Sequence, residues 1–172
     1  MEIDLIDRAL SLSREMKRDA SKIIEPPEEG FIAESNKVIP FAIVKGSRGY
    51  IEKVTNQING CYEKGWFDAC AVMIRRLLET LIIECFEEYE ISHKIQNSQG
   101  DFFYLKNLIN SILNENSWNI GRNAKKALPK LKDIGDKSAH SRRFIAHLND
   151  IKDLIPDLRL IVQELVYLAK LK

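Results

Sequence analysis

One histidine in this 172-residue chain stands among residues that could act on a phosphodiester. His140 follows Lys137 by three residues, so the two side chains share a face if a helix extends that far. A histidine among cations can act as a general base, while lysine or arginine stabilises a phosphorane-like transition state. Ser138 and Ser141 could donate hydrogen bonds. The structural alternative is that His140 ends the helix and caps its carbonyls or packs against a neighbour.

This histidine lies in a strongly basic segment, residues 122–143. The segment holds eight basic and two acidic residues, a net charge of +6, whereas the whole chain has a formal net charge of +1. Concentrated positive charge attracts the phosphates of nucleic acid. The candidate nucleic-acid-binding residues are Lys130, Lys132, Lys137, Arg142 and Arg143. A solvated helix face with scattered lysines is the alternative interpretation.

Two arginines interrupt a long apolar stretch, residues 66–86. Arg75 precedes Glu79 by four residues, a spacing that allows an ion pair on one helix face. Because a half-buried arginine requires a partner, the predicted role of this pair is to fix the helix in register inside the protein. The functional alternative is an arginine that reaches a ligand phosphate from the centre of the fold.

Patterns that would indicate a metal or cofactor site are missing from the sequence. The three histidines lack the spacing of a zinc motif such as H-E-x-x-H, and there is no glycine-rich phosphate loop and no G-x-S-x-G elbow. The three cysteines are an odd number without C-x-x-C spacing, which favours free thiols in a reducing cytoplasm. We therefore predict no metal, no cofactor and a cytoplasmic location.

The elements expected to position these residues are helices, because apolar residues recur at helical spacing along most of the chain. The expected helices cover residues 48–63, 66–86, 103–114, 119–127, 129 onward and 151–168. Apolar side chains surround most of the 66–86 helix, which is typical of a central helix. Asp101, Asn119, and Asn149 or Asp150 are the expected N-caps, and Pro156 should start or kink the last helix. The predicted fold is all-α, a compact bundle of about five to six helices.

Residues 1–47 are expected to form a separate part of the chain. Helical spacing predicts an amphipathic helix over residues 4–20, which Pro26 and Pro27 end. Residues 38–44, with Pro40, predict an extended strap over the bundle or an edge strand. The acidic start lacks the apolar core of a signal peptide, and no stretch approaches the roughly 18 apolar residues that cross a bilayer. We expect no membrane partner, and a bundle over residues 48–172.

Two segments resemble the HEPN superfamily, the helical "higher eukaryote and prokaryote nucleotide-binding" domains. The first is CYEKGWFDAC of residues 61–70, which continues into IRRLLE of residues 74–79; the second is IGDKSAH of residues 134–140. The likeness extends over about residues 48–170. It is nearest to an uncharacterised bacterial branch found in, or beside, restriction and phage-defence proteins. Members commonly dimerise with their motif at a shared cleft, so the resemblance implies a homodimer.

Ribonucleases of this superfamily carry an Arg-Asn-x-x-x-His motif, which the resemblance places on residues 135–140. His140 takes the position of the motif histidine and Asp136 that of the polar residue, but Gly135 stands where the arginine is expected. The implied catalytic residues are therefore His140, Asp136 and Lys137. Lys137, a nearby arginine or a residue of a partner subunit would have to supply the missing cation.

Three functions are compatible with these patterns. The first is a non-catalytic interaction module that binds RNA, another nucleic acid or a protein partner in a defence or stress system, and Gly135 favours it. The second is a metal-independent ribonuclease with His140 as general base, which the basic segment and the histidine favour. The third is a structural or oligomerisation domain. Salt-sensitive RNA binding separates the first two from the third, and His140→Ala separates the first from the second.

Overall fold

The computed structural model describes residues 37–172, in which the regular secondary structure is helical. These residues form η1 (Phe41–Ile43), α2 (Gly49–Glu63), α3 (Phe67–Glu88), η2 (Ser92–Ile95), α4 (Leu105–Asn114), α5 (Arg122–His140), α6 (Leu148–Lys152) and α7 (Ile155–Leu168), where η marks a 3-10 helix. Within this range there is no strand, only an isolated bridge between Gln96 and Phe102. The all-α prediction is confirmed. The helix predicted over residues 4–20 lies outside the described residues.

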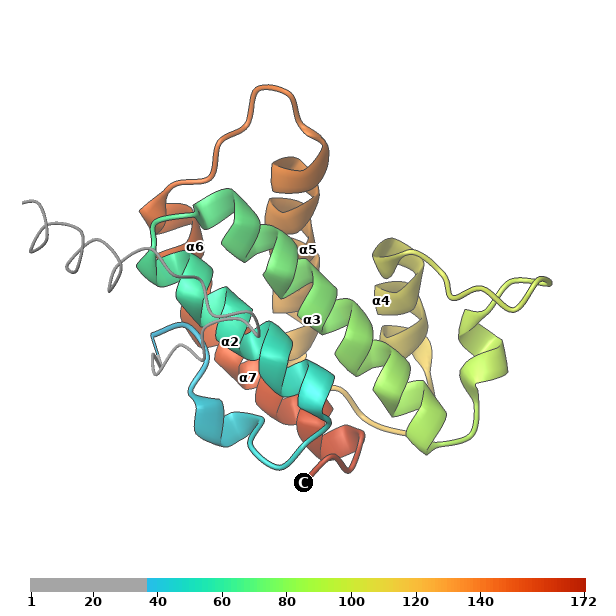
Figure 1. Ribbon diagram of the computed structural model, residues 1–172. Helices are drawn as coiled ribbons and strands as arrows, with labels where there is room; N and C mark the ends of the chain where they lie inside the picture. Colours follow the sequence, from blue (N-terminus) through green and yellow to red (C-terminus); the bar gives the residue numbers. More distant parts are fainter. Residues whose placement is uncertain (1–36) are drawn as a thin grey trace, which may run out of the picture. The chain divides into compact units, whose positions relative to one another are not determined.

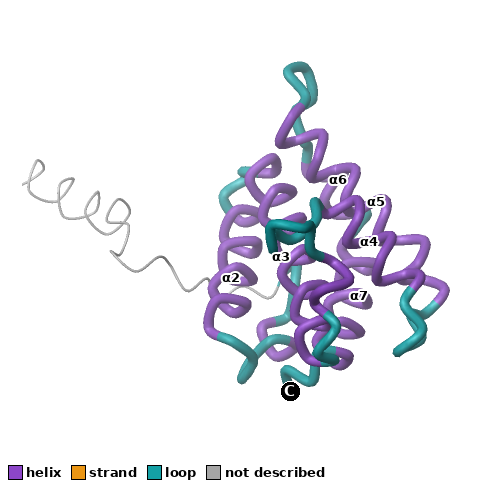
Figure 2. The backbone as a smooth tube through the Cα atoms, turned by 90° about the vertical axis from the view of Figure 1, so that its right-hand side faces the viewer, coloured by secondary structure: helices purple, strands orange, loops and turns teal. Residues whose placement is uncertain are grey.

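The central element is α3, which contacts all five other α-helices of the described region. Figure 1 shows α3 in green crossing the middle of the bundle, and Figure 2 shows the same helices after a quarter turn. Its buried apolar residues are Cys70, Ala71, Ile74, Leu77, Leu78, Leu81, Ile82, Cys85 and Phe86. Each large apolar side chain buried in this way contributes about 1.5–3 kcal/mol. The predicted central helix is confirmed.

The helix that carries the basic segment, α5, is continuous, whereas two helices separated before Pro129 were predicted. Proline cannot donate a hydrogen bond to the carbonyl four residues earlier and costs about 3 kcal/mol inside a helix. Pro129 lies on the exposed side of α5, where the carbonyl of Lys125 can meet water. The buried face continues across the proline through Ala124, Ala127, Leu128, Leu131 and Ile134. Burial of this face outweighs the local cost of proline.

The last predicted helix, residues 151–168, is divided into α6 and α7. The caps predicted for this helix and for the helix of residues 119–127 are also wrong, because other residues begin the helices found there. Gly121, not Asn119, precedes α5, and its amide donates a hydrogen bond of 2.6 Å to the Glu164 carboxylate. His147 precedes α6, and its amide donates at 2.7 Å to Asp150, which lies in the first turn. Carboxylates next to helix N-termini are favourable because of the helix dipole.

The start of α4 differs from the prediction, whereas Pro156 starts a helix, which is one of the two roles predicted for it. Tyr104 precedes α4, and Asp101 belongs instead to a turn in which its amide donates to the Asn97 side chain at 2.9 Å. Pro156 lies in the first turn of α7, where its fixed φ suits a helix and no hydrogen bond is lost. Proline therefore begins the last helix, as its position predicts.

Residues 37–44 form a strap of bends and a 3-10 helix, so the predicted edge strand is wrong. The amides of Val38 and Ile39 both donate to the Asn59 side-chain oxygen, at 3.1 and 3.0 Å, and the Ile39 carbonyl accepts from the Asn59 side-chain nitrogen at 2.9 Å. Arg159 of α7 donates to the Val38 carbonyl at 2.7 Å. Side chains of α2 and α7 thus replace the hydrogen bonds of a sheet. Val38, Ile39 and Val44 are fully buried in the same core as the bundle.

Candidate nucleic-acid interface

Gly135, the position to which the HEPN resemblance assigns an arginine, lies where α5 packs tightly against α3. A Cβ atom on Gly135 would lie 2.7 Å from the Cβ atom of Arg75 and 3.1 Å from the carbonyl oxygen of Ala71. Ordinary carbon–carbon contacts are about 3.5–4.0 Å long, so any side chain here would force the two helices apart. Packing therefore explains the glycine, and an arginine does not fit between α3 and α5.

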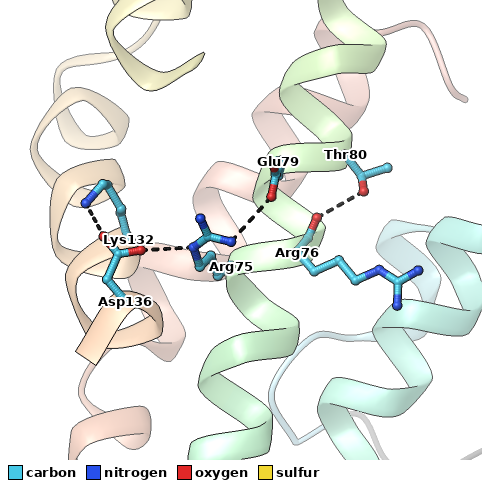
Figure 3. Close-up of polar contacts among 6 residues, drawn as sticks. All are labelled: Arg75, Arg76, Glu79, Thr80, Lys132 and Asp136. Carbon is cyan, nitrogen blue, oxygen red and sulfur yellow. Dashed lines mark hydrogen bonds and ion pairs between the residues drawn. The ribbon is translucent and has the colours of Figure 1, made fainter. Parts of the chain in front are cut away.

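Beside this contact, an ion-pair network joins the same two helices (Figure 3). The Arg75 Nε atom donates to one Asp136 oxygen at 2.9 Å, and its Nη1 atom lies 3.5 Å from Glu79. The amino group of Lys132 binds the other oxygen of Asp136. The predicted Arg75–Glu79 pair is present, and Asp136 and Lys132 extend it across the helix boundary. Arg76 points away from Asp136 in Figure 3.

Asp136 is held as a carboxylate by its two cationic partners. Partial burial alone would raise its pKa, but the hydrogen bonds from Lys132 and Arg75 outweigh this effect and place the pKa below its ordinary value. A carboxyl group that stays ionised cannot serve as a general acid near neutral pH. The geometry thus assigns Asp136 a role in holding α5 to α3, and it commits the amino group of Lys132 to that contact.

The outward face of α5 carries cations that the network does not use. Lys126, Lys130 and Lys137 are exposed and stand four and seven residues apart, so they share one side of the helix. Asp133 lies on the same side and pairs with Lys137 at 2.7 Å. Within residues 37–172, Lys126 and Lys130 have no ion-pair partner. The face is therefore positively charged, with one acid along it.

The C-terminal end of α5 extends this charge into the loop of residues 141–147. His140 is the last helical residue and is exposed, as are Arg142 and Arg143. Neither arginine has an acidic partner in the described region. We use the name basic face for Lys126, Lys130, Lys137, Arg142 and Arg143. Of the five predicted binding residues, Lys130 and Lys137 are thus exposed on one side of α5 and Arg142 and Arg143 are exposed in the loop that follows, whereas Lys132 lies in the network against α3.

Sequence reasoning counted Lys126 in the basic segment but did not include it among the candidate binding residues. It stands four residues before Lys130, a spacing that would have identified the shared face. The signal was lost because Pro129 divided the segment into two predicted helices. With α5 continuous, Lys126 and Lys130 become neighbours on one surface.

A second ion pair lies in the C-terminal half of α3. Glu84 is buried and accepts a hydrogen bond of 2.7 Å from the Arg48 Nε atom, and the Tyr50 hydroxyl also donates to it. Burial raises the pKa of Glu84, against the opposing effect of Arg48. This pair joins the start of α2 to α3 and takes no part in the basic face.

The described residues offer no cluster of three or more histidine, cysteine, aspartate or glutamate side chains that could bind a metal ion. All three cysteines are free thiols, and burial raises the pKa of Cys70 and of Cys85 to about 12. In the same part of the chain, no helix combines the length and apolar character needed to span a membrane. The exposed charges of α5 and its following loop are therefore the feature that we develop as a functional site.

Comparison with known proteins gives one match. A family model described as a domain of unknown function (DUF4145) matches residues 56–172, which comprise the second half of α2 and all of α3 to α7. No curated protein and no solved structure matches the chain. The matched region contains the α3–α5 contact, the ion-pair network and the basic face. The chain belongs to the DUF4145 family.

Proposed function

We propose that this chain is a HEPN-like module that binds RNA through the basic face and does not cleave it. The observation that carries the proposal is the row of exposed cations on α5 and the following loop, with Asp133 as the acid among them. Cations without acidic partners keep their full attraction for phosphate. Lys126, Lys130, Arg142 and Arg143 are such cations, whereas Lys137 would first have to break its contact with Asp133.

The dimensions of the row fit a nucleic-acid strand. Lys126 and Lys137 are eleven residues apart on one helix, which corresponds to roughly 16 Å at 1.5 Å per residue. Four of the five cations of the basic face have no acidic partner in the described region, and each of them can meet one phosphate. Arg142 and Arg143 lengthen the row beyond the end of the helix. A contact with about four phosphates is therefore within reach of the basic face.

Two features of the α3–α5 contact support binding without cleavage. The position expected for the motif arginine is closed by packing at Gly135, and Asp136 is engaged by Arg75 and Lys132. His140 thus lacks the arginine that would stabilise a transition state in the resembled ribonucleases. The HEPN likeness extends the proposal to a homodimer that acts in a defence or stress system.

A charge-reversal experiment tests the binding proposal. We expect the double variant Lys126→Glu/Lys130→Glu to bind labelled RNA much more weakly than the wild type. Its slope of log Kd against log salt should be smaller by about 1.4, because each phosphate contact on a single strand contributes about 0.7. The matched control is Lys53→Glu/Lys106→Glu, which changes the net charge equally at exposed lysines of α2 and α4. Equal losses in the two variants would refute a localised interface.

The ribonuclease alternative retains one favourable observation. His140 is exposed and precedes Arg142 by two residues and Arg143 by three, with Lys137 one turn earlier. Incubation of the wild type and His140→Ala with single-stranded RNA and tRNA in EDTA decides between the alternatives. Our proposal predicts intact RNA with both proteins. Cleavage by the wild type alone would establish a metal-independent ribonuclease in place of a binding module.

A further inference from the structure

An exposed tryptophan precedes α3 at the end of the bundle where α5 finishes. The side chain of Trp66 is 63% exposed, which is unusual for the largest apolar side chain. The other tryptophan of the chain, Trp118, packs edge-on against Phe86 and Tyr89 and donates its indole N–H to the Ile112 carbonyl at 3.1 Å. The fold thus uses one tryptophan for packing and leaves the other in solvent.

The backbone around Trp66 is fixed although its ring is exposed. Gly65 adopts a left-handed φ of 74° and ends α2, with its amide bonded to the Tyr62 carbonyl at 3.2 Å. The Trp66 amide donates to the Cys61 carbonyl at 2.8 Å, and its carbonyl accepts from Cys70 at 2.9 Å. This is a Schellman arrangement that runs directly into the first turn of α3. A ligand that binds this ring therefore has little backbone to order.

The loop of residues 141–147 reaches the same end of α3. The Ala146 amide donates to the Asp68 carboxylate at 3.1 Å, and Figure 1 shows the orange loop passing from α5 over the start of α3 towards α6. Exposed and covered residues alternate along this loop: Arg143 and Ile145 are exposed, whereas Phe144 is half-buried and Ala146 is buried. Alternation along the loop therefore turns the arginine outwards, at the end of the bundle that carries Trp66.

We propose that Trp66 is a stacking platform for an unpaired base, so that the ligand of the basic face is single-stranded RNA. This inference rests on the proposed function and specifies its substrate class. An aromatic ring combined with cations is the arrangement by which proteins bind single strands, because bases stack on the ring while phosphates meet the charges. A duplex hides the faces of its bases and gains nothing from Trp66. The exposed Arg142 and Arg143 belong to the loop that reaches the end of α3 preceded by Trp66, and this charge favours a nucleic acid over an apolar protein surface.

Tryptophan fluorescence provides the first test. In a Trp118→Phe background, Trp66 is the one remaining tryptophan, since the chain contains two. Titration with a uridine oligonucleotide should quench its emission, and a duplex of equal length should quench it much less. Absence of quenching at saturating single-stranded RNA would overturn the inference. Circular dichroism confirms that the background variant is folded, and the binding test below uses proteins that retain Trp118.

Affinity measurements on three further variants provide the second test. Trp66→Ala should weaken binding of the single strand about tenfold and leave duplex binding unchanged, since stacking of one base contributes on the order of a tenfold factor in affinity. Trp66→Phe should recover most of the loss, because phenylalanine retains a ring. Tyr167→Ala is the matched control: Tyr167 is 80% exposed but lies on α7, and its removal should change neither affinity.

The outcomes separate this inference from the proposed function. If Lys126→Glu/Lys130→Glu loses RNA while Trp66→Ala binds both ligands like the wild type, the basic face is correct and the stacking platform is wrong. If the wild type binds no RNA, the proposed function fails and this inference fails with it. If Trp66→Ala weakens single strand and duplex equally and also converts a dimer to a monomer in light scattering, Trp66 belongs to a protein interface, which overturns the inference.

Discussion

Replacement of Gly135 by alanine tests whether packing or lost catalysis explains the glycine in the IGDKSAH stretch. The added Cβ atom would meet the Cβ atom of Arg75 at 2.7 Å and the carbonyl of Ala71 at 3.1 Å. Both partners are tied to the backbone of α3, so rotation of a flexible side chain cannot relieve the contact. To reach an ordinary separation of about 3.5 Å, α5 must move away from α3 by roughly 1 Å.

The expected loss of stability follows from two opposing effects. Overpacking of a close contact costs about 1–3 kcal/mol, and alanine is favoured over glycine inside a helix by about 1 kcal/mol. Movement of α5 also stretches the 2.9 Å bond between Arg75 and Asp136. We therefore expect Gly135→Ala to lower the free energy of unfolding by about 1–2 kcal/mol. For a domain of this size the corresponding decrease in Tm is roughly 2–8 °C.

Thermal and urea unfolding followed by circular dichroism measure this change. Gly49→Ala is the matched control, because a Cβ atom at this first residue of α2 meets nothing within 4 Å. We expect the control to be as stable as the wild type or slightly more stable. If Gly135→Ala stabilises the protein as much as the control does, the α3–α5 contact has room for a side chain and our explanation of the glycine is wrong. A second variant, Gly135→Arg, tests the same point. We expect it to unfold the domain, whereas a contact with room for a side chain would allow it to fold.

Three further predictions concern charged and thiol groups. Asp136→Ala should lower the free energy of unfolding by about 1–2 kcal/mol at pH 7, measured by urea unfolding. This difference from the wild type should vanish as the pH falls through the lowered pKa of Asp136, because protonation of the carboxylate removes the same bonds. Glu84 has a raised pKa, so the wild type should lose stability relative to Glu84→Gln as the pH rises through that pKa. If the difference in free energy of unfolding between the two proteins is the same at pH 4 and pH 8, the raised pKa of Glu84 is contradicted. Thiol-reactive dye at pH 8 should modify half-buried Cys61 first, and should modify buried Cys70 and Cys85 at the rate of unfolding; equal rates for the three would disprove this order.

The central helix could be predicted from the sequence, but the extent of α5 could not. Residues 66–86 are apolar around most of the helix circumference, a pattern that needs no knowledge of neighbours. In α5 the local rule for Pro129 and the burial of the face on both sides of it conflict. Burial depends on what packs there, namely α3, α4 and α7, and these contacts do not appear in the local sequence. Tertiary packing therefore outweighs the local preference of Pro129 to interrupt the helix.

The Arg75 network shows the same limit at the level of a side chain. Its pair with Glu79 lies within one helix turn and follows from the spacing. Its bond to Asp136 joins residues 61 positions apart, and no periodicity indicates it. Asp136 therefore looks like a motif residue in the sequence, whereas in the structure it is an anchor between two helices. The strap is similar, because Arg159 binds the carbonyl of Val38 across 121 positions.

The most direct test of the account is fluorescence anisotropy of a labelled single-stranded RNA with the wild type, in EDTA, over a series of salt concentrations. Gel analysis of the same samples shows whether the RNA stays intact. We predict saturable binding that weakens with salt with a log–log slope of about −3, as expected for contact with about four phosphates, and RNA of unchanged length. Absence of binding at low salt, or binding that does not respond to salt, would contradict the assignment of the basic face as a nucleic-acid interface.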